Sequence, residues 1–188
     1  IQDLQSDKDV YSLFKDYFAN KNYLSDHSLL IIYFSSMLLN KLNWNNEQTL
    51  KQVIFASFFH DMFIPEHLAR VKNLNEVATL AEKEEVLAHI KKAGNVLETI
   101  RGINNDAHKI ITDHHERPDG TGFPHGLTAN QIPPLSCVFL ISHHIVDYLY
   151  DVNFNTSSLA DFIQSMQGEW DQGNFKRVFT SARNLLLD

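Results

Sequence analysis

The chain has 188 residues, of which 44% are hydrophobic and 21% are charged. This composition is that of an ordinary globular domain, and it excludes the disordered, collagen-like and disulfide-stapled classes. The formal net charge is −7 and no basic cluster occurs, which argues against DNA or RNA as a partner because nucleic-acid surfaces neutralise phosphates with clustered Lys and Arg. Cys137 is the single cysteine, so the sequence also excludes an internal disulfide and a thiolate metal cage.

No apolar run reaches the roughly 18–20 residues of a membrane span. Together with the single cysteine, this predicts a cytoplasmic protein without a membrane-spanning segment in this chain. The chain begins with Ile1 and shows no basic-then-apolar leader. We therefore expect it to be processed, or to be part of a longer protein with an upstream regulatory region.

Apolar residues recur at intervals of three and four along most of the chain, which is typical of amphipathic helices. Asn45-Asn46-Glu47 and Pro133-Pro134 are typical helix starts. The predicted helices cover residues 8–19, 23–41, 47–61, 79–101, 104–116, 134–150, 157–167 and 174–187. Because no alternating strand pattern or low-complexity linker competes with them, we predict a single all-α domain over residues 1–188.

Ten histidines stand against one cysteine, and five predicted helices carry histidines on or beside the face that should be buried. The residues concerned are His27, His60 with Asp61, His89, His114 with His115, and His143. A single inward histidine is usually a hydrogen-bonded core residue. This many buried imidazoles beside a carboxylate would leave donors and acceptors unsatisfied, whereas a cation satisfies them together. The pattern therefore indicates a metal centre.

The ligand types favour certain metals. Nitrogen-rich ligation without sulfur favours iron, with manganese, zinc or nickel as alternatives, over magnesium and calcium. Six histidines and one aspartate exceed the needs of a single ion. A carboxylate flanked by histidine can bridge two ions about 3.5–4 Å apart, as in two-metal phosphoesterases. Asp61 is the candidate for this catalytic bridge.

The stretch from His114 to Leu127, HHERPDGTGFPHGL, resembles the motif of the HD-GYP domains, a branch of the HD-domain metal-dependent phosphohydrolases that hydrolyses cyclic di-GMP. His60-Asp61 is similar to the HD pair of that family, and His89 to Leu97 resembles its histidine-bearing helix. The resemblance covers about residues 23–150. It implies an HD-domain bundle of about seven or eight helices around a binuclear metal site, followed by C-terminal helices in residues 151–188.

Carried over by position, the resemblance implies that Asp61 binds both metals. The other ligands would be His27, His60 and His143 for one metal, and His89, His114 and His115 for the other. The family usually has aspartate where this chain has His143, and the adjacent His144 is an alternative ligand. Family members with a third metal have glutamate where this chain has Tyr23, so we expect two metals.

The motif also implies a substrate loop with its supporting residues: Glu116, Asp119, Gly120, Gly122, Phe123 and Pro124. Glu116 and Asp119 would orient the ligands or the loop. Gly120 and Gly122 can adopt positive φ freely, which suits a tight loop beside the site, although a plain surface turn would use them equally well.

Three cations near the motif are candidates for phosphate contacts: Lys91, Lys92 and Arg117. Their alternative role is that of solvated charges on helix faces. Other positions depart from the family. Phe123 replaces the tyrosine of the GYP triplet, residues 62–65 lack the lysine that often follows the HD pair, and residues 148–155 lack arginine.

The leading hypothesis is hydrolysis of cyclic di-GMP, or of a related cyclic dinucleotide, to a linear dinucleotide or GMP. Two metals would hold a bridging hydroxide and neutralise the phosphate, which removes the objection raised by the acidic charge of the chain. The alternative is a degenerate domain that binds metal but hydrolyses little or nothing, and acts as a signalling module through a dinucleotide or a protein partner. A mixed-valent di-iron oxygenase is a third hypothesis, because the wider HD superfamily also hosts that chemistry.

Overall fold

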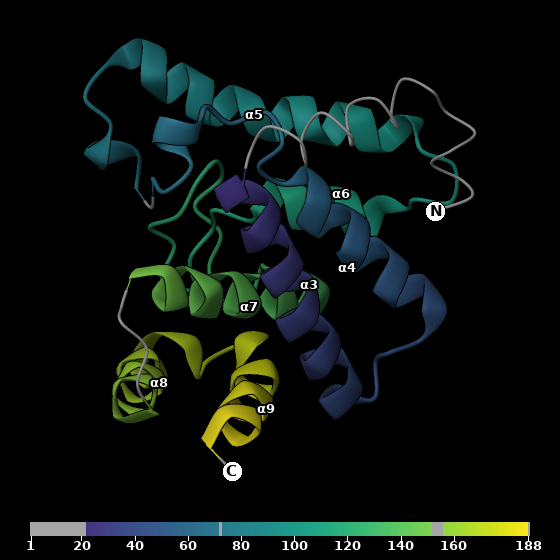
Figure 1. The fold of residues 1–188 in the computed structure, drawn as a ribbon, viewed down its shortest axis with the longest axis vertical. Coiled ribbons are helices and arrows are strands. Elements are labelled where there is room, and N and C mark those ends of the chain that lie inside the picture. The colour runs from purple at the N-terminus through teal and green to yellow at the C-terminus, as the bar shows by residue number, and fades with distance from the viewer. Residues whose placement is uncertain (1–21, 72, 152–155, 188) are drawn as a thin grey trace.

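The structure is a computed structural model that describes residues 22–71, 73–151 and 156–187 (Figure 1). Apart from one isolated bridge between Asp119 and Thr128, the regular structure within these ranges is helical. The predicted all-α fold is therefore confirmed. The predicted helix over residues 8–19 lies outside the described residues.

The described α-helices are α3 (Asn22–Leu42), α4 (Glu47–Phe59), α5 (Leu80–Thr99), α6 (Asn105–Asp113), α7 (Pro134–Asp151), α8 (Thr156–Trp170) and α9 (Phe175–Leu187). Their ends agree with the seven corresponding predicted helices to within three residues. Two short 3-10 helices, η1 (Glu66–Leu68) and η2 (Leu74–Glu76), were not predicted. Single turns of this kind leave no periodic apolar pattern in a sequence.

Side-chain caps fix several helix starts. The side chain of Asn46 accepts a hydrogen bond from the Thr49 N–H at the start of α4, at 2.9 Å. Thr79 and Glu82 form a reciprocal capping box at the start of α5. Each cap satisfies N–H groups that have no partner inside the helix.

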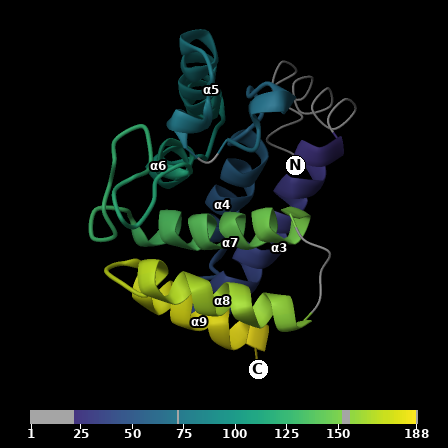
Figure 2. The same cartoon turned by 90° about the vertical axis from the view of Figure 1, so that its left-hand side faces the viewer.

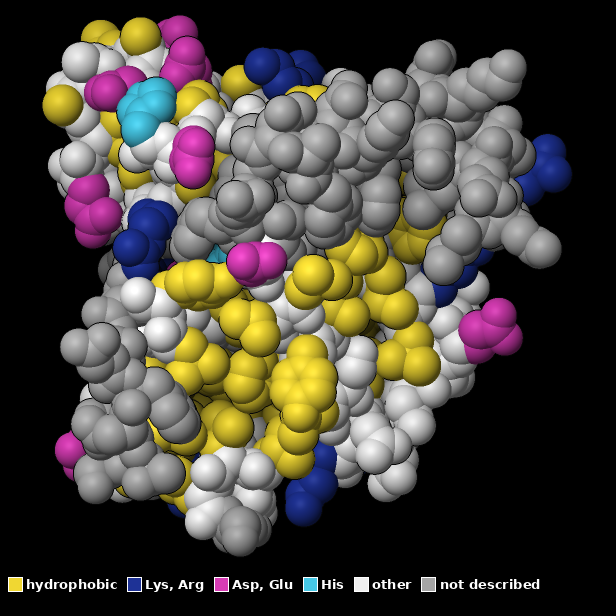
Figure 3. Space-filling model, viewed as in Figure 1, with side chains coloured by type: hydrophobic (Ala, Val, Ile, Leu, Met, Phe, Trp, Pro, Cys, Tyr) yellow, Lys and Arg dark blue, Asp and Glu magenta, His cyan; other side chains and the backbone are white. Residues whose placement is uncertain are grey.

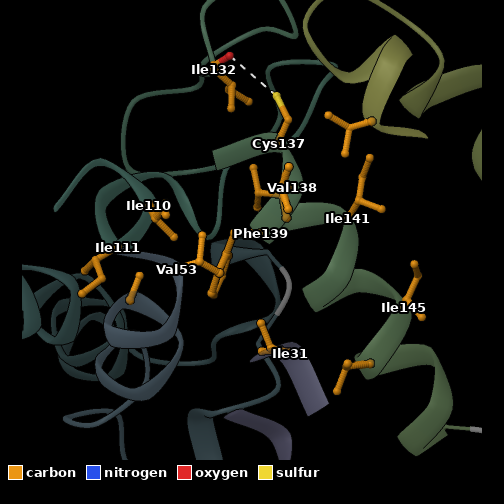
Figure 4. Packing of buried hydrophobic residues seen from close by; sticks show 14 of the residues in the cluster. Ile31, Val53, Ile110, Ile111, Ile132, Cys137, Val138, Phe139, Ile141 and Ile145 are labelled. Atoms are coloured by element: carbon orange, nitrogen blue, oxygen red, sulfur yellow. Dashed lines mark hydrogen bonds between the residues drawn. The ribbon is translucent and has the colours of Figure 1, made fainter. Parts of the chain in front are cut away.

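Helix α7 lies in the middle of the molecule and packs against α3, α6 and α9. Figure 2 shows α8 and α9 on one side of α7 and the α5–α6 pair on the other. The core around α7 consists of fully buried apolar side chains, among them Ile31 of α3, Val53 of α4, Ile110 of α6 and Phe139 of α7 (Figure 4). Four helices thus share one core, and most residues of the candidate site lie on these four helices or directly after their ends.

The C-terminal helices add to this core. Trp170, Phe175, Val178 and Phe179 are buried, so the apolar stripe of α9 packs inside the molecule. Hydrophobic side chains also gather on the face over α3, α7 and α9 that Figure 3 shows. None of the described helices has both the length and the apolarity that crossing a membrane requires.

Candidate metal centre

Two pairs of adjacent candidate ligands directly follow helix ends. Helix α4 ends at Phe59, just before His60-Asp61, and α6 ends at Asp113, just before His114-His115. The sequence predicted both helices to continue through these pairs, to residues 61 and 116. His60 and His114 keep the αR conformation, and the His60 N–H still donates to the Ala56 carbonyl, at 2.9 Å. Each pair therefore begins at the C-cap of its helix.

The other candidate ligands come from within helices: His27 from α3, His89 from α5 and His143 from α7. The structure brings all seven candidates together in two groups whose ligand atoms lie within 4.8 Å of one another. The His27 group consists of His27, His60, Asp61 and His143. The His89 group consists of Asp61, His89, His114 and His115. Asp61 belongs to both groups, as a bridging ligand must.

The two carboxylate oxygens of Asp61 face different groups. Oδ2 lies 3.2 Å from Nε2 of His60, in the His27 group. Oδ1 lies 3.4 Å from Nε2 of His114 and 3.6 Å from Nε2 of His89, in the His89 group. One carboxylate can therefore offer one oxygen to each of two cations.

The imidazole separations fit ligands of a common ion. The Nε2 atoms of His27 and His143 are 3.2 Å apart, and those of His89 and His114 are 3.1 Å apart. With metal–nitrogen bonds of about 2.0–2.1 Å at angles near 90–110°, two ligand nitrogens lie about 2.9–3.4 Å apart. Each group therefore has the spacing of a divalent-cation site.

Backbone carbonyls set the tautomers of two histidines. His60 Nδ1–H donates to the Ser57 carbonyl at 2.8 Å, and His114 Nδ1–H donates to the Ile111 carbonyl at 2.6 Å. Because a carbonyl can only accept, the proton is on Nδ1 and the lone pair on Nε2 faces the centre. The buried atoms His60 Nε2, Asp61 Oδ1 and His115 Nε2 have no hydrogen-bond partner among the described residues. Buried polar atoms are normally hydrogen-bonded. Buried nitrogen and oxygen atoms that have no hydrogen-bond partner therefore fit the role of ligands to a bound cation.

Burial also sets the protonation state that a cation requires. Burial, reinforced by a neighbouring imidazole, lowers the pKa of His27 and of His89 to about 3. Burial likewise lowers the pKa of His115 well below its usual value. For Asp61, burial alone would raise the pKa, but His60 and His114 bring it well below its usual value. At neutral pH His27, His89 and His115 are thus neutral imidazoles and Asp61 is an ionised carboxylate, which are the forms that bind metal.

The loop after α6 is held by Glu116. The buried carboxylate of Glu116 accepts hydrogen bonds from the backbone N–H groups of His125, at 2.7 Å, and Leu127, at 2.8 Å. Asp119 is exposed and accepts from both the N–H and the hydroxyl of Thr121, at 2.9 and 2.7 Å. Glu116 therefore orients the loop, whereas Asp119 closes a local turn within it.

The loop glycines have different roles. Gly120 has a φ of 80°, so it uses the conformational freedom of glycine. Gly122 does not have positive φ. Instead, a Cβ atom at Gly122 would collide with the backbone of Glu116 and Arg117. Close approach of two chain segments is what requires glycine there. Pro124 is exposed in the same loop.

The structure separates the two adjacent histidines of α7. His143 lies in the His27 group, whereas the ring of His144 stacks on Trp170, with centroids 5.0 Å apart and an interplanar angle of 20°. Asp147, one helical turn after His143, lies 3.3 Å from its Nδ1 atom. The sequence analysis missed Asp147, although its spacing of four residues from His143 on one helix face was a usable signal.

A cleft with a cavity volume of about 40 Å³ opens beside the ligands, and its wall includes His114, His115 and His143. The charged residues Arg70, Glu116, Arg117 and Asp147 also line it. Arg117 Nη1 lies 3.8 Å from Glu169 Oε1 of α8. The sequence analysis missed Arg70, which follows η1 in a segment without periodic pattern.

Lys91 and Lys92 do not line this cleft. Both are exposed on α5, and Lys92 lines a separate depression with Phe63 and Glu85. The structure therefore favours their alternative role as solvated charges and leaves Arg117 as the predicted cation beside the ligands.

The comparisons with known proteins agree with this geometry. A family profile described as HD domain matches residues 13–171. The chain is 28% identical over 178 residues to "Cyclic di-GMP phosphodiesterase PdeB" of Borreliella burgdorferi, an alignment that covers 89% of this chain and 45% of that protein. Its fold is similar to that of Bd1817, "a HDG"Y"P protein from Bdellovibrio bacteriovorus", with a TM-score of 0.59 and 16% identity over 88% of this chain and 53% of the other.

The chain spans about half the length of these two relatives. The family match covers most of the chain, and the helical fold places the His60-Asp61 pair and the HHE-to-GFP loop side by side. The chain therefore belongs to the HD-domain family.

Proposed function

We propose that this domain is a metal-dependent phosphodiesterase that hydrolyses cyclic di-GMP at a binuclear centre. The observation that carries the proposal is the pair of four-residue groups that share Asp61, with one carboxylate oxygen facing each group. Similarity to a relative named as a cyclic di-GMP phosphodiesterase supports the choice of substrate. Iron is the metal that the nitrogen-rich ligand set favours, with manganese, zinc and nickel as alternatives.

The candidate ligands fall into two sets, one for each cation. His27, His60 and His143 would hold one cation, His89, His114 and His115 the other, and Asp61 both. Two divalent cations bound there supply an activated water and neutralise the charge on phosphate. The carbonyls of Ser57 and Ile111 keep His60 and His114 in the tautomer that offers Nε2.

We assign phosphate binding to the two arginines of the cleft, whose wall also includes Glu116 and Asp147. With a net charge of −7, the chain needs local positive charge to hold a phosphodiester. Arg70 and Arg117 line the cleft together with His115 and His143. A guanidinium group can donate two parallel hydrogen bonds to one phosphate, and Glu169 helps to hold that of Arg117 in place. A phosphodiester between these arginines and the ligand histidines would lie directly beside the metals.

A second candidate function is that of a signalling module that binds metal and a dinucleotide or a protein partner without turnover. The observation that favours it is Phe123, which lacks the hydroxyl of the family tyrosine and is buried against His115. Losing one hydrogen bond to a developing charge costs roughly 10²–10³-fold in rate. The two candidates therefore differ in turnover and share the metal centre.

The deciding experiment is cyclic di-GMP turnover by protein purified without oxygen and loaded with Fe(II) or Mn(II), with bound metal counted in the same sample. We expect linear dinucleotide or GMP to accumulate on chromatography. Asp61→Asn should abolish the product, and Asp161→Asn, a matched loss of an exposed carboxylate on α8, should not. Absence of product from protein shown to hold two metals would refute the phosphodiesterase and leave the binding module.

A further inference from the structure

Asp147 lies beside two of the candidate ligands of one group and belongs to neither metal-binding group. It is located on α7, one turn after His143. Its Oδ2 atom lies 3.3 Å from Nδ1 of His143, and its Oδ1 atom lies 3.8 Å from Nδ1 of His27 on α3. One carboxylate thus faces imidazoles from two different helices.

The two imidazoles face Asp147 and the metal position with different nitrogens. Their Nδ1 atoms face the carboxylate, whereas their Nε2 atoms lie 3.2 Å apart on the side of the His27 group. The rings are nearly perpendicular, with an interplanar angle of 88°. A carboxylate on Nδ1 favours the tautomer with its proton there, which leaves the Nε2 lone pair free to bind a cation and makes it more basic.

The contact of Asp147 with His27 and His143 also changes the charge next to the His27 group. The two groups together contain six imidazoles and a single carboxylate, Asp61, to balance two divalent cations. In the His89 group, Nδ1 of His114 donates to the neutral carbonyl of Ile111. The His27 group instead has a full negative charge next to two of its imidazoles. Asp147 therefore supplies a negative charge beside the His27 group, where position 143 has an imidazole instead of a carboxylate.

We propose that Asp147 is a positioning residue of the His27 group, which orients His27 and His143 and compensates for the lack of a carboxylate at position 143. The inference rests on the metal centre of the proposed function, but it concerns metal affinity and not turnover. It predicts that Asp147 acts on one of the two metals only. Groups of this kind typically contribute 10–100-fold to metal affinity.

The test is a Mn(II) titration of the metal-free protein, followed by the electron paramagnetic resonance signal of free Mn(II). Asp147→Asn keeps the shape of the side chain and removes its charge. We expect one of two Mn(II) ions to bind about 10–100-fold more weakly and the other to bind as in the wild type. Asp147→Glu should retain more of the affinity, and Asp161→Asn, on the exposed face of α8, should change neither site.

Double variants identify the metal that Asp147 serves. In a His89→Ala background, Asp147→Asn should remove most of the remaining Mn(II), because each change impairs a different group. In a His143→Ala background, Asp147→Asn should weaken Mn(II) binding less than it does in the wild type, because one of the two imidazoles that Asp147 contacts is absent. Wild-type affinities in Asp147→Asn, or equal weakening of both ions, would overturn the proposal. Because the readout is binding, a protein that never hydrolyses cyclic di-GMP can still confirm or refute it.

Discussion

The ring of Phe123 lies nearly parallel to the imidazole of His115, with ring centroids 4.4 Å apart and an interplanar angle of 19°. The Phe123 backbone N–H also donates to the His115 carbonyl, at 3.1 Å. The loop after α6 is thus joined to the His89 group through both the side chain and the main chain of one residue. A change at Phe123 should therefore affect the site directly.

Restoring the family tyrosine should strengthen the handling of substrate. We expect Phe123→Tyr to raise cyclic di-GMP turnover or affinity by about 10-fold, the effect of one hydrogen bond to a charged group. Phe123→Leu is the matched control, because it removes the stacking on His115 and adds no hydroxyl. Turnover and equilibrium binding measure the two effects. Unchanged values in Phe123→Tyr would mean that the loop does not contact the substrate.

Removing the shared ligand should release both metals. We expect Asp61→Ala to lose most bound metal and, at saturating metal, to lose the stabilisation of about 3–4 kcal/mol that tight ligands confer on a folded state. Metal analysis and thermal unfolding with and without added Mn(II) provide the measurements. Asp161→Ala serves as the control for loss of an aspartate. Full occupancy in Asp61→Ala would contradict the bridging role.

The metal-free protein should lose stability as the pH falls. His27 and His89 have a pKa of about 3 when folded, against an ordinary value of 6.5, so the unfolded chain binds more protons between these values. The free energy of unfolding should therefore be constant above about pH 6.5. Below this pH, each of the two histidines should lower it by roughly 1 kcal/mol per pH unit. Urea unfolding at several pH values measures this slope. His89→Gln should make the slope of unfolding free energy against pH shallower, and His67→Gln, at an exposed position, should leave it unchanged. An equal slope in His89→Gln and in the wild type would refute the burial argument.

Two glycine-to-alanine changes should have opposite effects. A Cβ atom at Gly122 would collide with the backbone of Glu116 and Arg117, so we expect Gly122→Ala to destabilise the fold by at least about 1–3 kcal/mol. Gly168 lies in α8 with no atom within 4 Å of its Cβ position, so Gly168→Ala should stabilise by up to about 1 kcal/mol. Urea unfolding midpoints compare the two. Similar stabilities would show that the loop can move away from residue 122.

The sequence was sufficient to predict the helices and the meeting of the ligands, because both depend on apolar periodicity. A histidine three or four residues from a buried aliphatic side chain, as His89 is from Val86 and Ala93, must face the core. The helix ends before His60 and His114 were less predictable, because the turns follow from the convergence of distant segments. Periodicity continues through these positions even though the helix does not.

Polar residues outside the periodic pattern were the ones that sequence reasoning missed or misplaced. Arg70 and Asp147 resemble ordinary surface charges, and only the packing of α7 and the η1 segment brings them to the cleft. Lys91 and Lys92 lie close to His89 in sequence, but helical geometry turns them to the exposed face of α5. Within a helix, a charge is therefore placed by the helix face on which it lies: Asp147 shares the face of His143, whereas Lys91 and Lys92 do not share that of His89.

The two metal-binding groups are closed by segments of very different length. His89 and His114 are 25 residues apart, whereas His27 and His143 are 116 residues apart. The entropy lost in closing a loop grows with its length, and contacts between distant segments form late in folding. We therefore expect the His89 group to assemble first, around the α5–α6 pair. The His27 group would follow when α7 docks on α3. The sequence separation of the ligands would thus determine which group binds its metal first.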